Sequence, residues 1–411
     1  MNPKSYINLN YKPNRNDLIA NFYIEPARGV TLRDACEDIA AESSIGTWTE
    51  LTTMEPDIKK LGPHVFRIKE SGEVLIAYPS LLFEEGNMPQ ILSSIAGNIF
   101  GMKAIKNLRL LDVEFPENIV KSFPGPRFGI HGVRRILHVR KRPLVGTIIK
   151  PKLGLNSEKH AHVAYESWVG GCDLVKDDEN LTNQSFNPFK ERVIKTLEMR
   201  DRAEEETGEK KIYIPNITAE TGEMIRRAEF VRENGCEYVM IDIVTAGFSA
   251  VQSLREEDLG LVIHAHRSMH AAFTRNKKHG ISMLVLAKIS RLIGVDQLHI
   301  GTAVGKMEGP REEVVETKDA ITRKWYDIKD VFPVCSGGLH PGLVPELIGI
   351  TGNDIIIQAG GGVHGHPEGT RKGAMAMRQA VDAVMNSISL EEYAKEHREL
   401  QAALDKWNPN G

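Results

Sequence analysis

Short apolar segments alternate with longer amphipathic segments from about residue 143 to the end of the chain. The short segments are rich in Val and Ile and do not alternate between apolar and polar residues, which is typical of parallel strands covered on both faces. They comprise residues 144–152, 172–178, 211–218, 238–244, 261–267, 297–303, 332–338 and 354–362. The longer segments predict helices; in residues 187–206, for example, Phe189, Val193 and Leu197 share one face after Pro188. Eight strand–helix units in about 270 residues favour a TIM (β/α)8 barrel, with a doubly wound open sheet as the structural alternative.

The first 125 residues follow a different pattern. The predicted elements are strands at residues 17–26 and 107–116, helices at 31–44 and 89–101, and a hairpin formed by 64–71 and 73–80. Their order, β-α-β-β-α-β, is that of a ferredoxin-like α+β fold. A chain of 411 residues also exceeds one ordinary domain. We therefore expect an α/β protein in which a ferredoxin-like N-terminal domain, residues 1–125, precedes a TIM-barrel catalytic domain, residues 126–411.

Composition narrows the class of protein without indicating an activity. Hydrophobic residues make up 41% of the chain and charged residues 26%, and the net charge of -3 gives no indication of a nucleic-acid or membrane partner. No apolar run reaches the roughly 18 residues of a transmembrane helix, and the polar N-terminus lacks a signal-peptide core. The four cysteines are far apart and form no CxxC pair, which favours free thiols and argues against a zinc site. We expect a cytoplasmic protein.

Polar residues gather where the predicted strands end, which is the end of a TIM barrel that carries function. The candidates are Lys150, Lys152, Lys176, Asp178, Glu179, His264, His266, Arg267, His299, Lys306, Ser336, Gly337, Gly338, Gly360, Gly361 and Gly362. Each signal is weak alone, because charge runs are usually solvated, strand histidines are usually hydrogen-bonded core residues, and Gly-rich turns are common. Their coincidence at equivalent positions of one closed sheet indicates a single site.

The run Lys176-Asp177-Asp178-Glu179 directly follows a predicted strand. Residues i and i+2 of a strand face the same side, so Lys176 and Asp178 point together and Glu179 joins them as the strand ends. Two carboxylates suit Mg²⁺, which prefers oxygen ligands, whereas an ammonium group repels it. Lys176 is therefore either a distant charge partner or an amine that CO2 converts to a carbamate, which supplies the missing oxygen. An ordinary Lys–Asp ion pair is the structural alternative.

Two further groups of residues indicate proton transfer and anion binding. Lys150 and Lys152 share a strand face, and the repulsion between two ammonium groups prepares one of them to give up a proton; a doubled phosphate-binding patch is the alternative. The glycines after the last two strands fit the usual phosphate site of this fold. Arg267 and His299 suggest a second anion site. Two anion sites around a metal suggest a bisphosphorylated sugar, whose enediolate a divalent ion would stabilise.

Several stretches of the chain together resemble the large chain of ribulose-1,5-bisphosphate carboxylase/oxygenase (RuBisCO). In the second domain they are GTIIKPKLGL, GGCDLVKDDEN, HAHRSMHAAF, HIGTAVGKMEG, CSGGLHPG and QAGGGVHGHPEG, and in the first domain AAESSIGTWT and SSIAGNIFGMKA. The resemblance runs from about residue 10 to the end. The compact length and the segments HAHRSMHAAFTR and HGISMLVLAK are most similar to the archaeal form III branch, which is associated with nucleotide salvage as well as with carbon dioxide fixation cycles.

The resemblance implies a role for each candidate. Lys176 would be an N6-carboxylysine that holds one Mg²⁺ with Asp178 and Glu179 and takes the C3 proton of ribulose bisphosphate. The other implied catalytic residues are Lys150 as general acid/base, Lys152 beside the metal, His266 in proton transfer, Lys306 on a loop that closes over the site, and Glu42. The implied substrate-binding residues are Thr47, Trp48, Asn98, Lys152, Arg267, His299, Ser336, Gly337, Gly338, Gln358, Gly360 and Gly361.

The resemblance also implies an assembly and an activity. Glu42 and Asn98 match first-domain residues that reach the active site of a partner subunit, so a homodimer with interfacial active sites is expected, with further assembly open and no small subunit required. The implied enzyme is a lyase that carboxylates ribulose bisphosphate and also acts on O2 as a monooxygenase (an oxidoreductase activity).

Two departures from the family pattern keep alternatives open. Ile148 stands where the family commonly has a substrate-contacting threonine, and Thr147 is one step back on the other strand face; Glu368 is a second variation. Ile148 favours the alternative of a RuBisCO-like enolase or isomerase that acts on a methionine-salvage ketose phosphate. A non-catalytic assembly protein on the same fold is the third possibility, since fold alone does not determine function.

Overall fold

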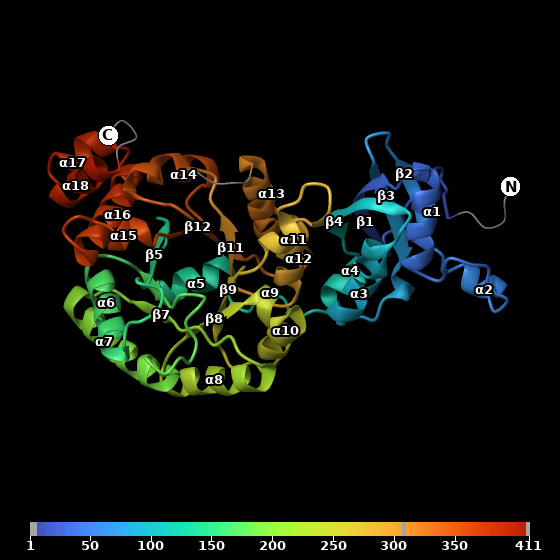
Figure 1. Cartoon of the computed structure of the whole chain (residues 1–411). Coiled ribbons are helices and arrows are strands. Elements are labelled where there is room, and N and C mark those ends of the chain that lie inside the picture. Colours follow the sequence, from blue (N-terminus) through green and yellow to red (C-terminus); the bar gives the residue numbers. More distant parts are fainter. Residues whose placement is uncertain (1–5, 306–309, 408–411) are drawn as a thin grey trace. The chain divides into compact units, whose positions relative to one another are not determined.

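The computed structural model describes residues 6–305 and 310–407, and the chain forms two compact units (Figure 1). The first unit comprises Met1–Pro124, Met269–Ile293 and Trp325–Ile328, and the second comprises Gly125–Ser268, Gly294–Lys324 and Lys329–Gly411. The first unit thus includes two later segments of the chain. The predicted division into domains at residue 125 stays a prediction. Within the described residues, no helix is both long enough and apolar enough to cross a membrane.

The first unit is built on a five-stranded sheet with the order β10-β4-β1-β3-β2. Its strands are β1 (Asp17–Pro26), β2 (His64–Ile68), β3 (Glu73–Pro79), β4 (Ile105–Glu114) and β10 (Gly280–Ile281). Its helices are α1 (Leu32–Glu42), α2 (Pro56–Lys59), α3 (Met88–Ile95), α4 (Glu117–Lys121), α11 (Ala271–Thr274) and α12 (Met283–Leu292), with 3-10 turns η1 (Ser80–Leu82) and η2 (Asn98–Gly101). Strands β1 to β4 pair antiparallel in the predicted ferredoxin-like arrangement. Strand β10 adds a parallel edge next to β4 that the sequence pattern did not predict.

One predicted helix of this unit is wrong in extent. The expected helix over residues 89–101 ends at Ile95 and continues as the separate turn η2. The reason is Gly97: a Cβ atom at this position would lie 2.0 Å from the backbone oxygen of Ser93, so the chain folds back closely there. The start of α1 is as expected, because the Thr31 hydroxyl accepts a hydrogen bond from the backbone N–H of Asp34 at 3.1 Å.

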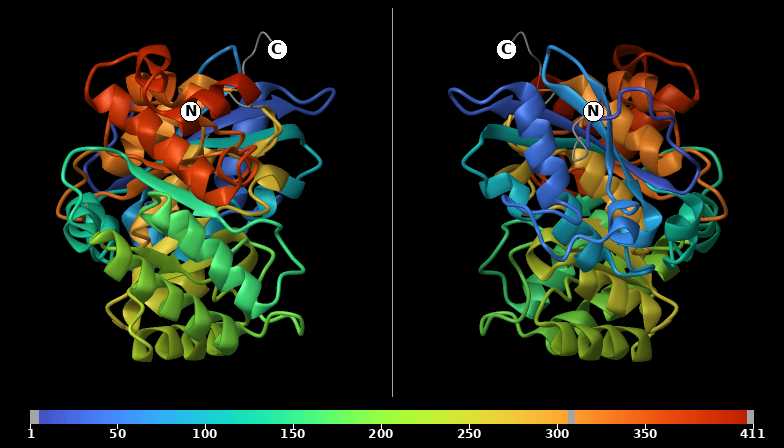
Figure 2. Two further views of the ribbon diagram at one scale, coloured as in Figure 1. Left: turned by 90° about the vertical axis from the view of Figure 1, so that its left-hand side faces the viewer. Right: turned by 90° about the vertical axis from the view of Figure 1, so that its right-hand side faces the viewer.

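The second unit contains the eight predicted parallel strands, surrounded by helices (Figures 1 and 2). The strands are β5 (Leu144–Ile148), β6 (Leu174–Lys176), β7 (Ile212–Ile214), β8 (Tyr238–Asp242), β9 (Val262–His266), β11 (Gln297–Gly301), β12 (Phe332–Ser336) and β13 (Ile356–Gln358). The helices are α5 (Gly129–Leu137), α6 (Ser157–Val169), α7 (Phe189–Thr207), α8 (Thr221–Glu233), α9 (Ile243–Ala246), α10 (Phe248–Glu256), α13 (Arg311–Thr322), α14 (Val344–Thr351), α15 (Gly361–His364), α16 (Thr370–Met385), α17 (Leu390–Ala394) and α18 (Arg398–Lys406), with the 3-10 turn η3 (Pro341–Leu343).

The sheet closes on itself, which excludes the doubly wound alternative. Its order is β7-β6-β5-β13-β12-β11-β9-β8, and the two end strands meet through a parallel bridge between Asn216 and Met240. At this seam the N–H of Met240 donates to the oxygen of Pro215 at 2.8 Å, and the N–H of Ile217 donates to the oxygen of Met240 at 3.1 Å. The predicted TIM barrel is therefore confirmed.

The inward faces of the strands change character from one end of the barrel to the other. Toward the N-terminal ends they are apolar, with Leu144, Leu174, Tyr238 and Phe332 in one buried cluster to which Val133 of α5 belongs. Successive inward residues of a strand are two positions apart. Toward the C-terminal ends of the strands, the residues at these inward positions are polar. These polar inward residues are Lys176, Asp178, Asn216, Asp242, His264, His266, Gln297, His299, Ser336 and Gln358. One end of the barrel is thus sealed by hydrophobic packing, and the other end presents a polar mouth.

Candidate functional site

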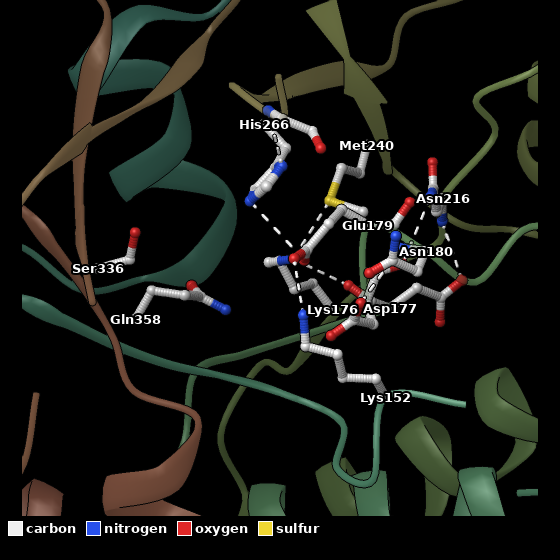
Figure 3. Close-up of polar contacts among 12 residues, drawn as sticks. Lys152, Lys176, Asp177, Glu179, Asn180, Asn216, Met240, His266, Ser336 and Gln358 are labelled. Atoms are coloured by element: carbon white, nitrogen blue, oxygen red, sulfur yellow. Dashed lines mark hydrogen bonds and ion pairs between the residues drawn. The ribbon is translucent and has the colours of Figure 1, made fainter. Parts of the chain in front are cut away.

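Lys176, the last residue of β6, is the central group of the mouth (Figure 3). Its side chain is fully buried. The ammonium nitrogen lies 2.9 Å from the backbone oxygen of Asp177, 3.4 Å from the sulfur of Met240 and 3.8 Å from Oε2 of Glu179. Burial lowers the pKa of Lys176 below that of an ordinary lysine and outweighs the attraction of the nearby carboxylates. The neutral amine is therefore favoured here more than on a solvated lysine.

The two lysines that follow β5 each lie beside a carboxylate of the same run. Lys150 Nζ is 2.7 Å from Oδ2 of Asp178, and Lys152 Nζ is 3.5 Å from Oε1 of Glu179. The ordinary Lys–Asp ion pair that the sequence left open therefore exists, but its lysine is Lys150. Lys176, by contrast, makes no hydrogen bond to a carboxylate among the described contacts and lies closest to a carbonyl oxygen and a thioether.

Asp177 points away from the mouth and is fully bonded within the chain. Its carboxylate accepts hydrogen bonds from Arg192 Nε at 3.1 Å, from the Tyr213 hydroxyl at 2.7 Å and from the Asn216 N–H at 2.9 Å, and His160 Nε2 lies 3.0 Å away. Burial alone would raise the pKa of Asp177, but the charges of Arg192 and His160 outweigh it and hold the pKa well below its usual range. Asp177 is therefore a structural charge that anchors β6 to the surrounding helices.

The donor set of the mouth fits a hard divalent cation only if Lys176 changes its chemistry. Within the described residues, no three His, Cys, Asp or Glu side chains form a group able to hold a metal ion. Asp178 and Glu179 supply two carboxylates, and the third group beside them is the amine of Lys176. Magnesium prefers oxygen ligands. A carbamate on Lys176 would replace the nitrogen with oxygen donors and complete such a set, whereas the unmodified amine would not.

His266, at the end of β9, lies on the opposite side of Glu179 from Lys152 (Figure 3). Its Nε2 is 3.7 Å from Oε2 of Glu179, and its Nδ1 is 3.2 Å from Oδ1 of Asp242 and accepts the N–H of Ser268 at 3.2 Å. Asp242 was not among the predicted site residues. Its position at the end of β8 is the signal that would have found it, because the functional residues of a TIM barrel lie at the C-terminal ends of its strands.

A string of buried hydrogen bonds crosses three strands behind His266. Gln297 Oε1 lies 2.7 Å from His264 Nδ1, His264 Nε2 lies 2.8 Å from His299 Nε2, and His299 Nδ1 lies 2.8 Å from the Ser336 hydroxyl. Burial lowers the pKa of His264 to about 3 and holds the pKa of His299 well below its ordinary value, so both rings are neutral at pH 7. His264 and Gln297 received no role from the sequence, although each stands two residues before a predicted site histidine and therefore on the same strand face.

Arg267 directly follows β9 and is the one cation of this part of the mouth without a hydrogen-bond partner among residues 6–305 and 310–407. Burial lowers its pKa to about 10, so it stays charged at pH 7. Gly301 gives it room, because a Cβ atom there would lie 2.6 Å from the guanidinium. Arg267 is partly buried, and the charge of Glu313 acts on it, but its N–H groups have no hydrogen-bond partner among the described residues. These free donors support the predicted anion site.

The glycines after β12 and β13 have no side chains to cover their backbone, so a ligand at the mouth could approach the backbone closely. Gly338 has a left-handed φ of 65°, and both Gly338 and Gly361 face open space where a side chain would lie. Gln358 lies deeper: it is fully buried, its Nε2 donates to the Thr147 oxygen at 2.9 Å, and its Oε1 has no partner among the described residues. Gly146 permits this, since a Cβ atom there would lie 2.4 Å from that oxygen.

The threonine next to the departure from the family pattern is turned away from the mouth. The Thr147 hydroxyl donates to the Ala359 oxygen at 2.7 Å and lies 3.0 Å from His364 Nε2. Ile148 occupies the inward face instead, and a Cβ atom on Gly360 would contact its side chain at 3.7 Å. The hydroxyl of Thr147 is therefore committed to the fold.

Comparison with known proteins explains this arrangement. The family model of the ribulose bisphosphate carboxylase large chain catalytic domain matches residues 129–407, and that of its N-terminal domain matches residues 5–119. The chain belongs to the RuBisCO large-chain family. Ribulose bisphosphate carboxylase of Methanocaldococcus jannaschii is 59% identical over 98% of this chain and 99% of the relative, and that of Pyrococcus abyssi is 55% identical over 98% and 96%.

Solved RuBisCO structures have the same fold. The octameric ribulose-1,5-bisphosphate carboxylase/oxygenase of Pyrococcus horikoshii, in complex with sulfate, superposes with a TM-score of 0.94 at 54% identity and covers 98% of this chain and 96% of its own. The dimeric archaeal Rubisco of Hyperthermus butylicus gives a TM-score of 0.93 at 48% identity and covers 98% of both chains.

The predicted RuBisCO residues of the N-terminal part meet in one pocket of the first unit. Glu42, Thr47, Trp48 and Asn98 line a cavity of about 650 Å³, and Asn98 Nδ2 donates to Glu42 Oε1 at 3.4 Å. The Trp48 side chain is 91% exposed at this pocket. Lys306, the predicted loop lysine, lies outside the described residues.

Proposed function

We propose that this chain is an archaeal form III ribulose-1,5-bisphosphate carboxylase/oxygenase, which adds CO2 to ribulose bisphosphate and cleaves the product to two molecules of 3-phosphoglycerate. The observation that carries the proposal is Lys176: a fully buried amine, favoured in its neutral form, beside two carboxylates that lack a third oxygen donor. Carbamate formation needs a neutral amine, and the carbamate would supply the missing oxygen. Family membership of the whole chain supports the same activity.

In this proposal, Lys176 as N6-carboxylysine, Asp178 and Glu179 would hold one Mg²⁺. When bound, Mg²⁺ would polarise the substrate oxygens and stabilise the negative charge of the enediolate. As the carbamate, Lys176 would be the base that takes the proton from C3 of ribulose bisphosphate. CO2 then forms a bond to C2, water adds at C3, and the C2–C3 bond breaks. In the competing oxygenase reaction O2 adds at C2 in place of CO2.

The remaining residues of the mouth move protons and hold the substrate. Lys150, whose ammonium group is 2.7 Å from Asp178, protonates the carbanion left on C2 after cleavage. Lys152 and His266 lie on the two sides of Glu179 and assist the proton transfers. Lys306 would close over the site and stabilise the new carboxylate.

The bisphosphate is held at two ends. Arg267, which has no partner among the described residues, and its neighbour His299 form one phosphate subsite. The backbone at Gly337, Gly338, Gly360 and Gly361 forms the other, with Thr47 and Trp48 of a partner subunit. Ser336 binds a substrate hydroxyl, and Gln358 supports the floor of the site from below.

The proposed assembly is a homodimer, or an oligomer of dimers, without a small subunit. The support for this assembly is the pocket of Glu42, Thr47, Trp48 and Asn98. Its lining residues all belong to the first unit, and none of them comes from the barrel. The pocket alone therefore lacks the metal and proton-transfer residues of the proposed site. The related P. horikoshii and H. butylicus proteins are octameric and dimeric.

A second candidate function is that of a RuBisCO-like isomerase or enolase on a related ketose phosphate. It is favoured by Ile148 on the inward face and by the Thr147 hydroxyl, which bonds to Ala359 and His364 and is unavailable to a substrate. Such an enzyme would need the same base and cation but no carboxylation.

Fixation of ¹⁴CO2 after preincubation with CO2 and Mg²⁺ distinguishes the two functions. A carboxylase incorporates label into 3-phosphoglycerate when ribulose bisphosphate is added. Turnover of a diketopentyl phosphate without incorporation of label would select the isomerase or enolase. As a control within the carboxylase, Lys306→Ala should stop carboxylation and leave some C3 proton exchange, and unchanged carboxylation in this variant would show that the loop assignment is wrong.

A further inference from the structure

The string of hydrogen bonds from Gln297 to Ser336 is isolated from solvent, and its donors and acceptors follow one order along it. Gln297 and His264 are fully buried and His299 is 2% exposed. Gln297 and His264 are cross-strand neighbours in β11 and β9, so the pleat of the barrel places them together. The rings of His264 and His299 meet edge to face with centroids 4.8 Å apart. Each hydrogen bond of the string is 2.7 or 2.8 Å long.

The amide of Gln297 determines which atoms of the string carry protons. Its Oε1 faces His264, and its Nε2 has no partner among the described residues. In this orientation the carbonyl oxygen can only accept, so Nδ1 of His264 carries the proton. A neutral imidazole has one donor and one acceptor, so Nε2 of His264 is bare and accepts from Nε2–H of His299. Nδ1 of His299 is then bare and accepts from the Ser336 hydroxyl. A proton added to Nε2 of His264 would place two N–H donors against each other at 2.8 Å. A proton added to Nδ1 of His299 would instead require the Ser336 hydroxyl to turn and accept.

We propose that Gln297 and His264 are positioning residues that fix the tautomer of His299 and thereby make Ser336 a hydrogen-bond acceptor toward the substrate. The hydroxyl proton of Ser336 is committed to His299, so only its lone pairs face the mouth. A substrate hydroxyl must therefore donate to Ser336. The statement about the substrate rests on the proposed function, whereas the statement about the tautomers rests on the hydrogen bonds alone.

The same string of hydrogen bonds gives Arg267 and His299 different roles in the phosphate subsite. Both ring nitrogens of His299 are occupied by His264 and Ser336, so the ring has no free N–H for an anion in this arrangement. Arg267 has no such commitment among the described residues. The guanidinium therefore supplies the N–H donors to a phosphate, and the neutral His299 forms the wall of the subsite.

The direct test is solid-state ¹⁵N NMR of the full-length protein labelled in its histidines, without ligand and at pH 7. His264→Gln and His299→Asn variants assign the two rings among the 14 histidines of the chain. The expected result is a neutral His264 protonated at Nδ1 and a neutral His299 protonated at Nε2. The opposite pair of tautomers, or a cationic ring, overturns the proposal. Inorganic phosphate, added as a probe, should leave Nδ1 of His299 unprotonated.

Matched variants of Gln297 test whether the string reaches the substrate. Gln297→Glu keeps an acceptor for His264, whereas Gln297→Met keeps the shape and removes it. We expect Gln297→Met to mix the two tautomers in the NMR spectrum and to raise KM for ribulose bisphosphate about 3- to 10-fold, the size of one hydrogen bond, with a smaller change in kcat. Gln297→Glu should retain both the spectrum and KM. Equal KM values for the two variants would contradict the proposed role.

The two arms separate a failure of this inference from a failure of the proposed function. The NMR measurement needs no substrate, so the predicted tautomers can be found in a chain that fixes no CO2. Conversely, if the chain fixes CO2 but shows the opposite tautomers, the proposed function stands and the positioning role of Gln297 and His264 is wrong.

Discussion

Asp177 and Asp178 are neighbours in sequence and lie on opposite faces of the chain as it leaves β6, and their surroundings differ in kind. Asp177 has four partners, and all of them are buried: one residue each of α6, α7 and β7, and Asn216, which follows β7. Asp178 has two partners: the ammonium group of Lys150, whose side chain is 28% exposed, and the backbone N–H of Asn180, which donates to Oδ1 at 3.1 Å. The carboxylate that is fully bonded within the chain holds the barrel together, and the one with spare bonding capacity faces the chemistry. The number of partners separates structural from functional charge better than burial does, since both carboxylates are buried.

The largest expected effect comes from removing the amine on the functional face. Lys176→Met keeps the length of the side chain and removes the nitrogen, so it abolishes carbamate formation and the base that depends on it. We expect ¹⁴CO2 fixation to fall by about 100- to 10,000-fold, the range for loss of a general base. The substitution removes one hydrogen bond to the Asp177 backbone oxygen and a contact with the Met240 sulfur, but it also removes the cost of burying an amine. The melting temperature should therefore stay close to that of the parent protein. Retained Mg²⁺-dependent fixation in this variant would refute the assignment.

The next largest effect compares the two aspartates directly. Asp177→Asn removes the charge that Arg192 and His160 face in a fully buried network, and breaking such a pair costs about 3 to 5 kcal/mol. Asp178→Asn is the matched control, and it should lose CO2 and Mg²⁺ activation with a much smaller loss of stability, because Lys150 can be solvated. Urea denaturation followed by circular dichroism measures both. A similar loss of stability in the two variants would remove the distinction between the two faces.

The pH dependence of activation by CO2 tests whether Lys176, on the functional face, has a lowered pKa. Burial lowers the pKa of this amine from the ordinary value of 10.5. Because the pKa of Lys176 is lowered, its neutral, reactive form is populated at a lower pH than in an ordinary lysine. This form is lost as the pH falls through the shifted pKa. Once the pH is well above the shifted pKa, nearly all of the amine is neutral and its population no longer rises. The rate of activation by CO2 should therefore rise with pH and level off below 10.5. A rate that keeps rising through that pH would indicate a solvated amine.

The smallest effect is expected at the ion pair of Glu368 and Arg398, which is one of the departures from the family pattern. The pair is 2.6 Å long, but the Arg398 side chain is 84% exposed. Solvent screens such a pair, so Glu368→Gln should reduce stability by at most about 1 kcal/mol and leave KM unchanged. The same urea titration and the fixation assay check it, and a change in KM would place Glu368 near the phosphate instead of on the surface.

Local spacing predicted much of the barrel. The eight strands stand out because each is a short Val- and Ile-rich run, and the step of two residues placed Lys176 and Asp178 on one face without any structure. The α3–η2 break was missed, because it depends on the close approach of Gly97 to Ser93, which no periodicity records. Strand β10 was missed because two residues are too short to show a pattern.

The contacts that define the site could not be read from spacing, because they join distant parts of the chain. Asp177 looked like one more acid of the run until Arg192 of α7 and His160 of α6 were placed around it. The pairing of His264 with Gln297 depends on the register of β9 against β11. The predicted roles of Glu42 and Asn98 depend on a second subunit, which a single chain does not contain.

The central claim is that CO2 modifies Lys176, and chemical trapping of a ¹³C-labelled carbamate tests it most directly. The protein is incubated with ¹³CO2 and Mg²⁺, the adduct is trapped by alkylation, and the labelled peptide is identified by mass spectrometry. The account predicts a single carbamate on Lys176 that is absent from Lys176→Met. A protein that fixes CO2 without label on residue 176, or that carries the label on Lys150 or Lys152, would contradict it.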